Sequence, residues 1–237
     1  TVPKPIAVVV CYPSNPTAQT ATLDFYRQVV EFATEHDLFI LSDLAYAEVY
    51  FGDTPTPSML QIDGARDRTI EFTSMSKTYS MAGFRVGFAA GSQRLVSALA
   101  RVKSYLDYGA YTPVQVAACA ALDGPQDCVE EMRTIYRHRR DVLVESFGRI
   151  GWKIPVPEAS MFAWAPLPAG CEAMGSLEFA KQLMEEAGVA VAPGIGFGEH
   201  GEGFVRLALV ENEQRIRQAA RGVGEFLRTR QPAVRAV

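Results

Sequence analysis

Lys77 stands among side chains that suit the binding of a phosphorylated aldehyde. It ends the run Ser74-Met75-Ser76-Lys77, and Arg85 follows eight residues later. A lysine amine can form a Schiff base with an aldehyde, while hydroxyls and a guanidinium can bind a phosphate. A lysine in a hydroxyl-rich loop is also a common solvated surface residue. This segment alone therefore leaves both interpretations open.

Three predicted strands precede polar residues. Apolar runs cover residues 6–12, 38–41 and 69–73, and Asn15, Asp43 and Ser74 follow them in that order. Such β-branched runs without polar alternation are typical of strands covered on both faces of a sheet. Between the first two runs, residues 20–37 carry apolar side chains at helical spacing, and Thr20 or Thr22 could cap this helix. A strand, a helix and a strand in this order form a right-handed parallel crossover.

The crossover predicts that these polar residues share one edge of the sheet. Ligands of open parallel sheets lie beyond the carboxyl ends of the strands. Each residue also has a simpler explanation. Asn15 could belong to an ordinary turn, and Asp43 could cap a helix or be a solvated loop carboxylate. Arg85 could lay its stem over the sheet and pair with a surface acid. Their matching positions favour a common site, and its chemistry is that of pyridoxal 5′-phosphate (PLP).

With these residues in place, the chain resembles the fold-type I, PLP-dependent aminotransferases of class I/II. The resemblance runs nearly end to end and is closest to the bacterial glutamate-pyruvate (alanine) aminotransferases. It rests on the motifs at residues 15–20 (NPTAQT), 43–47 (DLAYA), 74–77 (SMSK), 81–88 (MAGFRVGF), 105–109 (YLDYG), 174–181 (MGSLEFAK) and 204–212 (FVRLALVEN). It implies an α/β fold of the aspartate aminotransferase type: a large domain with a mostly parallel sheet and flanking helices, and a small α+β domain.

The resemblance also implies a cofactor site. Its residues would be Asn15, Asp43, Tyr46, Ser74, Ser76, Lys77 and Arg85. Lys77 would be the Schiff-base lysine that also moves the proton, and Asp43 would keep the pyridine nitrogen protonated so that the ring acts as an electron sink. Asn15 and Tyr46 would form hydrogen bonds with the ring oxygen O3′. The two serines and Arg85 would bind the phosphate.

Arg206 is implied as the arginine that grips the α-carboxylate of the substrate, and Asn15 as a second substrate-binding residue. It stands in the apolar run FVRLALV at residues 204–210, where a charge without a partner would be costly. An anionic ligand would be a natural partner, and an internal Asp or Glu is the alternative. One position departs from many relatives of the family: Ala18 replaces the Gly that follows Asn-Pro-Thr. The nearest subgroup also carries Ala there.

The second half of the chain changes character near residue 151. The resemblance implies a fourth strand at 85–90 that is adjacent to the other three in the sheet, and we expect helices at 93–106, 113–122 and 126–149. Beyond these we expect strands at 161–165, 189–192 and 204–209, with helices at 176–187 and 211–228. Residues 1–150 would belong to the PLP-binding large domain with its linking helix, and residues 151–237 would form the small domain. Residues 194–198 (GIGFG) superficially resemble a dinucleotide loop, but no helix is expected after them.

Composition narrows the functional classes. The 237 residues are 48% hydrophobic and 21% charged, with a net charge of -4, which is ordinary globular composition. No basic stripe suggests nucleic acid, and no apolar run approaches the ~20 residues of a membrane span. Four scattered cysteines (Cys11, Cys119, Cys128 and Cys171) suggest reduced thiols in the cytoplasm. The three dispersed histidines do not suggest a metal site.

The chain begins without Met and almost on a strand, so by resemblance it is the carboxyl-terminal portion of an enzyme. In the family, the amino-terminal portion supplies a phosphate-binding glycine loop, a ring that stacks on the pyridine and a tyrosine that reaches across the dimer. We therefore expect exposed outer strands and no transamination by this chain alone. The intact protein should be a homodimer, with residues 105–113 at its interface.

The predicted function is transfer of an amino group between an α-amino acid and a 2-oxo acid in cytoplasmic amino acid metabolism. Alanine and glutamate with pyruvate and 2-oxoglutarate are the expected substrates. One alternative is another fold-type I activity, such as a methionine or aromatic aminotransferase or a carbon-sulfur β-lyase. A second alternative is the non-catalytic aminotransferase-like module of a transcription regulator.

Overall fold

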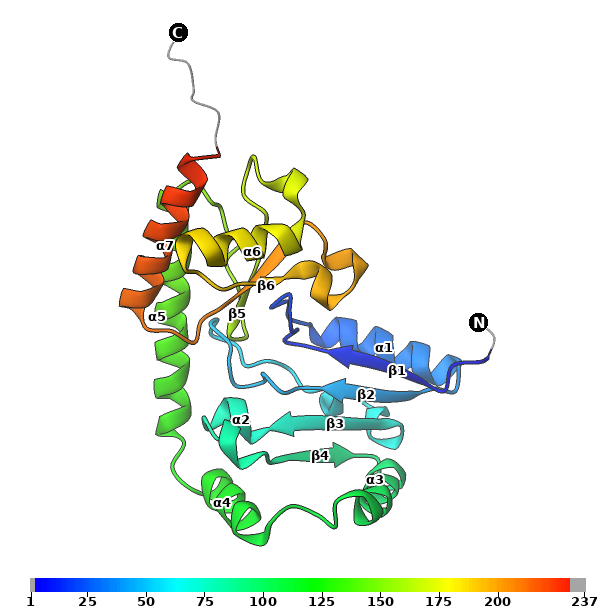
Figure 1. The fold of residues 1–237 in the computed structure, drawn as a ribbon. Coiled ribbons are helices and arrows are strands. Elements are labelled where there is room, and N and C mark those ends of the chain that lie inside the picture. The colour runs from blue at the N-terminus through cyan, green and yellow to red at the C-terminus, as the bar shows by residue number, and fades with distance from the viewer. Residues whose placement is uncertain (1–2, 231–237) are drawn as a thin grey trace. The chain divides into compact units, whose positions relative to one another are not determined.

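The computed structural model describes residues 3–230, which form two compact units (Figure 1). The first unit contains the chain up to Asn15 together with Gln19–Arg133. The second contains Pro16–Ala18 and the chain from Thr134 onward. The helix α5 (Asp127–Arg149) contributes residues to both units. The division into domains at residues 150 and 151 stays a prediction.

A four-stranded sheet organises the first unit in the order β1-β2-β3-β4 (Figure 1). Its strands are β1 (Ala7–Cys11), β2 (Phe39–Asp43), β3 (Thr69–Ser74) and β4 (Gly87–Gly91). The first three pair in parallel, and β4 runs antiparallel to β3. The short connection through α2 (Met75–Thr78) turns the chain back at the edge where β3 ends, so β4 must run in the opposite direction. The four expected strands, their adjacency in one sheet and the mostly parallel pairing are confirmed.

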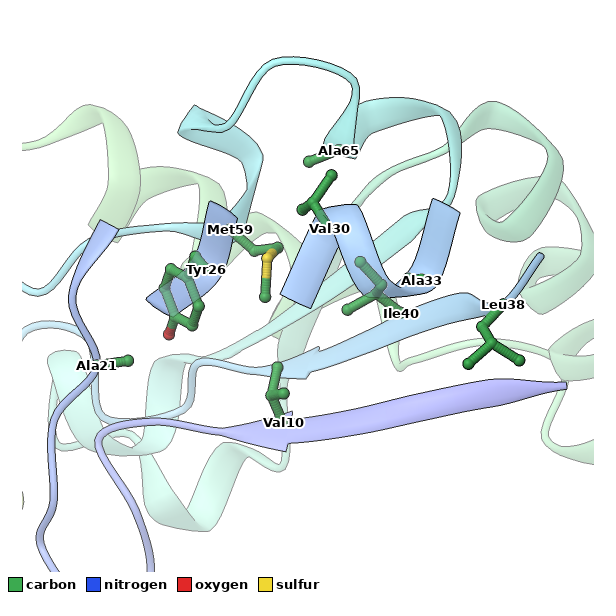
Figure 2. Packing of buried hydrophobic residues seen from close by; sticks show 9 residues of the cluster. All are labelled: Val10, Ala21, Tyr26, Val30, Ala33, Leu38, Ile40, Met59 and Ala65. Atoms are coloured by element: carbon green, nitrogen blue, oxygen red, sulfur yellow. The ribbon is translucent and has the colours of Figure 1, made fainter. Parts of the chain in front are cut away.

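Helix α1 (Leu23–Glu35) covers one face of this sheet and makes its core. Tyr26, Val30 and Ala33 are its buried residues, at the spacing that places side chains on one helical face. They pack with residues of β1 and β2 and with the segment that follows β2 (Figure 2). The residues of this cluster are Val10, Ala21, Tyr26, Val30, Ala33, Leu38, Ile40, Met59 and Ala65. Of the two threonines proposed as caps, Thr22 is the one that caps α1, because its side chain accepts the Phe25 N–H at 3.1 Å.

The prediction that the strands are covered on both faces is wrong for β1 in the described chain. Val9, which points away from α1, is 68% exposed, and Phe88 of β4 is 44% exposed. Successive side chains of a strand point to opposite faces of the sheet, so covering the face to which Val9 points would need another layer of structure. Among residues 3–230 no element supplies that layer at Val9. Helix α3 (Gln93–Leu106) contacts β3 and β4 instead.

The rest of the first unit consists of α3, α4 (Thr112–Asp123) and the start of α5. The second unit contains the sheet β5-β7-β6 with antiparallel pairing, formed by β5 (Phe162–Pro166), β6 (Ala192–Pro193) and β7 (Phe204–Ala208). Its helices are α6 (Ser176–Ala187), α7 (Glu213–Arg228) and the later part of α5. Edge-to-face contacts join Phe147, Trp152, Phe179 and Phe226 in its core.

The strand expected at residues 189–192 is shorter than predicted, because the end of α6 uses its first residues. The Gly188 N–H donates to Met184 and the Val189 N–H donates to Leu183, a common helix ending with glycine in a left-handed conformation. After β6 come 3-10 turns at Gly194–Phe197 and Glu199–Gly201, which is not the long helix of a dinucleotide loop. Within residues 3–230, no helix has the length and apolar character needed to cross a membrane.

Replacing Thr22 with Ala should loosen the first turn of α1 by about 1 kcal/mol, because the Phe25 N–H loses its acceptor. Amide hydrogen exchange at Phe25 should become about fivefold faster. Thr22→Ser keeps the oxygen and serves as the control. Equal exchange rates in the two variants would contradict the assigned cap.

Candidate active site

The carboxyl ends of β1, β2 and β3 lie side by side. In the register of the sheet, Cys11 is opposite Asp43, and Asp43 is opposite Phe72. The Tyr12 N–H donates to the Asp43 carbonyl at 3.3 Å, which continues the pairing to the last residues of both strands. The segments after these strands carry Asn15, Asp43 and Ser74 to Lys77. The structure therefore brings these residues to one edge, as the crossover predicted.

Lys77 lies in the single-turn helix α2 that follows β3. Ser74 caps this helix, since its hydroxyl accepts the Ser76 N–H at 3.3 Å. Ser76 is buried and Lys77 is half-buried. The Lys77 amine lies 5.6 Å from the centre of the Tyr46 ring, and Tyr46 is buried in the turn that follows β2. Two strand-end segments thus present a lysine and a tyrosine to each other.

Arg85 returns to the same place through the antiparallel pairing of β3 and β4. Ser74 is opposite Gly87 in the register, and the Met75 N–H donates to the Val86 carbonyl at 3.2 Å. Arg85 is exposed, with a left-handed backbone (φ 51°). Its guanidinium donates to the carbonyl of Ala82 in its own turn at 3.1 Å. The arginine therefore stands next to the serine-rich start of α2, in a turn that it stabilises itself.

Cys11 belongs to this edge, although the sequence did not suggest a role for it. Asp43 accepts the Ala45 N–H at 3.1 Å, and the Cys11 thiol lies beside the Asp43 carboxylate. Burial raises the pKa of the Cys11 thiol; the Asn15 backbone N–H lowers this pKa, and the charge of Asp43 raises it. The thiol therefore stays protonated beside the carboxylate. The available signal was its position, because Cys11 ends β1 as Asp43 ends β2.

Arg206 occupies the centre of β7 in the second unit. It is opposite Trp164 of β5 and Ala192 of β6. The carbon centre of its guanidinium lies 4.2 Å from the ring centroid of Phe162 and 4.8 Å from that of Phe197. Phe162 is buried, whereas Phe197 is 41% exposed. Aromatic faces attract a guanidinium and restrict the orientation of its plane.

The sequence analysis missed this aromatic set, which also includes a Trp164 ring stacked on Phe204 at 5.4 Å. A usable signal was present. Phe162 and Trp164, like Phe204 and Arg206, are two residues apart on a strand and so share a face. The loop residue Phe197 gave no such signal, because only the turns after β6 bring it to Arg206.

Two glycines hold the loop that carries Phe197. A Cβ at Gly194 would lie 1.9 Å from the carbonyl oxygen of Gly201, so only glycine permits this approach of the two backbones. Ser176 adds a second tie, because its hydroxyl accepts the Ile195 N–H at 3.1 Å and donates to Glu202 at 3.0 Å. The loop is therefore fastened at both of its ends.

The family model for aminotransferase class I and II matches residues 2–223. The putative aminotransferase AatC of Rhizobium meliloti (strain 1021) is 63% identical over 226 residues, which cover 95% of this chain and 56% of that protein. The glutamate-pyruvate aminotransferase AlaC of Escherichia coli (strain K12) is 52% identical over 226 residues, which cover 95% of this chain and 55% of that protein. The LL-diaminopimelate aminotransferase of Moorella thermoacetica (strain ATCC 39073 / JCM 9320) is 45% identical over 208 residues, which cover 88% of this chain and 53% of that protein.

Solved structures agree with these sequence matches. The substrate-bound structure of BacF from Bacillus subtilis superposes with a TM-score of 0.89 at 32% identity, covering 93% of this chain and 56% of that chain. The chain thus spans little more than half the length of the relatives it matches.

Gly194→Ala should destabilise the second unit by about 1–3 kcal/mol, because the new methyl group would collide with the Gly201 backbone. Gly196→Ala is the matched control, since nothing lies within 4 Å of a Cβ at that position. Urea unfolding followed by tryptophan fluorescence suits this comparison, because both tryptophans belong to the second unit. Equal midpoints for the two variants would disprove the close approach.

Proposed function

Because the chain belongs to the aminotransferase class I and II family, we propose that its protein transfers an amino group between an α-amino acid and a 2-oxo acid. The observation that carries this proposal is the meeting of a lysine, a tyrosine and a carboxylate at one edge of a parallel sheet. The Lys77 amine faces the Tyr46 ring at 5.6 Å, and Asp43 ends the strand from which the Tyr46 turn begins. These groups suit covalent chemistry on a carbonyl compound.

The same residues fit PLP as the cofactor. A carboxylate, an amine, and a set of hydroxyls beside an arginine match its ring nitrogen, its aldehyde and its phosphate. Bound PLP supplies an electron sink for negative charge at the substrate α-carbon. The residues that would hold it are Asn15, Asp43, Tyr46, Ser74, Ser76, Lys77 and Arg85.

Each residue would do one part of the work. Asp43 would keep the ring nitrogen protonated, with its carboxylate hydrogen-bonded by the neighbouring Cys11 thiol. Lys77 would attach the cofactor and move a proton at its Nζ atom. Tyr46 and Asn15 would bind the ring oxygen. The serines and Arg85 would bind the phosphate.

Arg206 would bind the substrate carboxylate through both arms of its guanidinium. A carboxylate matches this planar fork, and a lysine cannot reproduce the match. The rings of Phe162 and Phe197 restrict the plane of the fork before substrate arrives. Less side-chain freedom then has to be lost on binding.

For the substrates we propose alanine and glutamate with pyruvate and 2-oxoglutarate, supported by the 52% identity to the glutamate-pyruvate aminotransferase AlaC. The 45% identity to an LL-diaminopimelate aminotransferase supports LL-diaminopimelate, a diamino dicarboxylic acid, as the second candidate amino donor. Steady-state assays of the intact protein with alanine and with LL-diaminopimelate as amino donors would distinguish the two candidate substrates. A β-lyase would instead release pyruvate and ammonia from cysteine conjugates.

We further propose a cytoplasmic homodimer with residues 105–113 at its interface and no nucleic acid partner. Tyr105, Tyr108 and Tyr111 support the interface, since each of these residues is at least 76% exposed in the described chain. Exposed tyrosines of this density are typical of surfaces that bind another protein.

Lys77→Ala in the intact protein should remove the covalently bound cofactor, because Lys77 supplies the attaching amine. Visible absorbance should be lost, and reduction with borohydride should no longer add the cofactor mass. Lys103→Ala is the control, since Lys103 forms an exposed ion pair with Asp107 at 2.6 Å. An undiminished mass adduct in the Lys77 variant would exclude the proposed role.

Arg206→Lys should raise the KM for both amino acid and oxo acid, because a point charge replaces a fork. A lost charge-assisted hydrogen bond costs about 1.5–3 kcal/mol, which corresponds to about a 10- to 100-fold change. Arg215→Lys in α7 is the control, because the Arg215 side chain donates to the Gln218 side chain of its own helix at 3.0 Å. Unchanged KM values for both substrates would mean that Arg206 serves the fold.

A further inference from the structure

The turn that carries Tyr46 is held from outside the sheet by Arg133 of α5. The backbone of this turn makes two hydrogen bonds within the turn. The Ala47 N–H donates to the Leu44 carbonyl at 3.1 Å, and the Val49 N–H donates to the Tyr46 carbonyl at 3.0 Å. These bonds close the turn but do not fix its direction relative to its neighbours. The contacts of Arg133 supply that restraint, although Arg133 is distant in the sequence.

Arg133 uses all of its guanidinium nitrogens at the start of α5. Its Nε donates to the Glu48 carbonyl at 3.2 Å, its Nη2 to the Glu48 carboxylate at 3.0 Å, and its Nη1 to the carboxylate of Glu130. The guanidinium lies 4.0 Å from the ring centroid of Tyr50. Only 11% of the side chain is exposed. These contacts fix both the position and the plane of the group.

The backbone contact and the ring contact carry more weight than the ion pair. The Glu48 carboxylate is 45% exposed, and ion pairs that reach solvent contribute little because water screens them. The Glu48 carbonyl belongs to the turn itself, two residues after Tyr46. A bond to this carbonyl therefore restrains the path of the chain at Tyr46.

The same end of α5 also contacts the segment of Lys77. The Tyr79 hydroxyl donates to the Gln126 side chain at 2.8 Å, and Tyr79 is the residue that ends α2. Gln126 is fixed in turn, because its amide donates to the carbonyls of Ala121, Leu122 and Gly124. Burial raises the pKa of Tyr79, so its hydroxyl stays available as a donor. Gln126, which precedes α5, and Arg133 in α5 thus contact the two segments that carry the Lys77 and Tyr46 side chains.

We propose that Arg133 is a positioning residue, which sets the orientation of Tyr46 toward Lys77 through the Glu48 carbonyl and the Tyr50 ring. The proposal rests on the proposed function, in which Tyr46 binds the cofactor ring oxygen. Loss of the fork would let the turn move, and the Tyr46 hydroxyl would leave its place. Displacements of about 1 Å in such a group can cost about 100-fold in rate.

The principal test uses Arg133→Lys in the intact protein with bound PLP. Lysine keeps the charge but cannot form the fork or stack on Tyr50. We expect kcat to fall about 10- to 100-fold and the visible spectrum of the bound cofactor to shift toward that of Tyr46→Phe. Two control variants should leave kcat and the visible spectrum unchanged. Glu48→Gln keeps the Glu48 carbonyl, and Arg149→Lys alters an exposed ion pair with Glu145 in α5.

A double-mutant comparison decides whether Arg133 acts through Tyr46. In the Tyr46→Phe background, Arg133→Lys should produce little further spectral shift. A shift of full size in that background would overturn the proposal. Tyr50→Leu tests the ring contact of Arg133 separately, and it should shift the visible spectrum in the same direction as Arg133→Lys by a smaller amount.

Hydrogen exchange separates this proposal from the proposed function. The Val49 amide, which bonds to the Tyr46 carbonyl, should exchange faster in Arg133→Lys than in Arg149→Lys, with or without PLP. Unchanged exchange at Val49 would show that Arg133 does not hold the turn. If Tyr46→Phe leaves the spectrum unchanged while Val49 exchanges faster, the role of Tyr46 fails and the restraint by Arg133 stands.

Discussion

The parallel register of β1, β2 and β3 is the constraint on which the proposed site depends. It sets Cys11 beside Asp43 and places the segment of Lys77 next to the segment of Tyr46. A slip by a single residue would turn every side chain of a strand to the opposite face. Asp43 would then leave the Cys11 thiol, and α1 would no longer meet an apolar surface. The core and the candidate site are therefore fixed by the same pairing.

A buried carboxylate pins part of this register. Glu71 of β3 is 6% exposed and accepts hydrogen bonds from the hydroxyls of Ser42 at 3.0 Å and Ser58 at 2.6 Å, and from the Met59 N–H at 2.9 Å. A buried charge is tolerated when donors satisfy it, and any other register of β2 and β3 would remove Ser42 from reach. The strand that ends at the Lys77 segment is thereby tied to the strand that ends at Asp43.

In the second unit, strand pairing likewise fixes the position of a candidate functional side chain, and the contacts around that side chain are aromatic. Arg206 is placed by the pairing of β7 with β5, and its guanidinium lies against the rings of Phe162 and Phe197. The loop that brings Phe197 depends on the glycine contact at Gly194, because a side chain there would separate the two backbones. In both units the regular element sets the position of a functional side chain, and irregular segments adjust its orientation.

The sequence by itself determined which elements form and where their polar ends lie. Local spacing encodes a strand or a helix, so the bounds of α3 and α6 and the edge that collects Asn15, Asp43 and Lys77 could be predicted. The tertiary structure decided the contact of Cys11 with Asp43, the exposed side of β1 at Val9, and the rings around Arg206. It also decided the hold of Arg133 on a turn 85 residues earlier. Such contacts depend on register and packing between segments far apart in the chain, and no periodicity along the sequence records them.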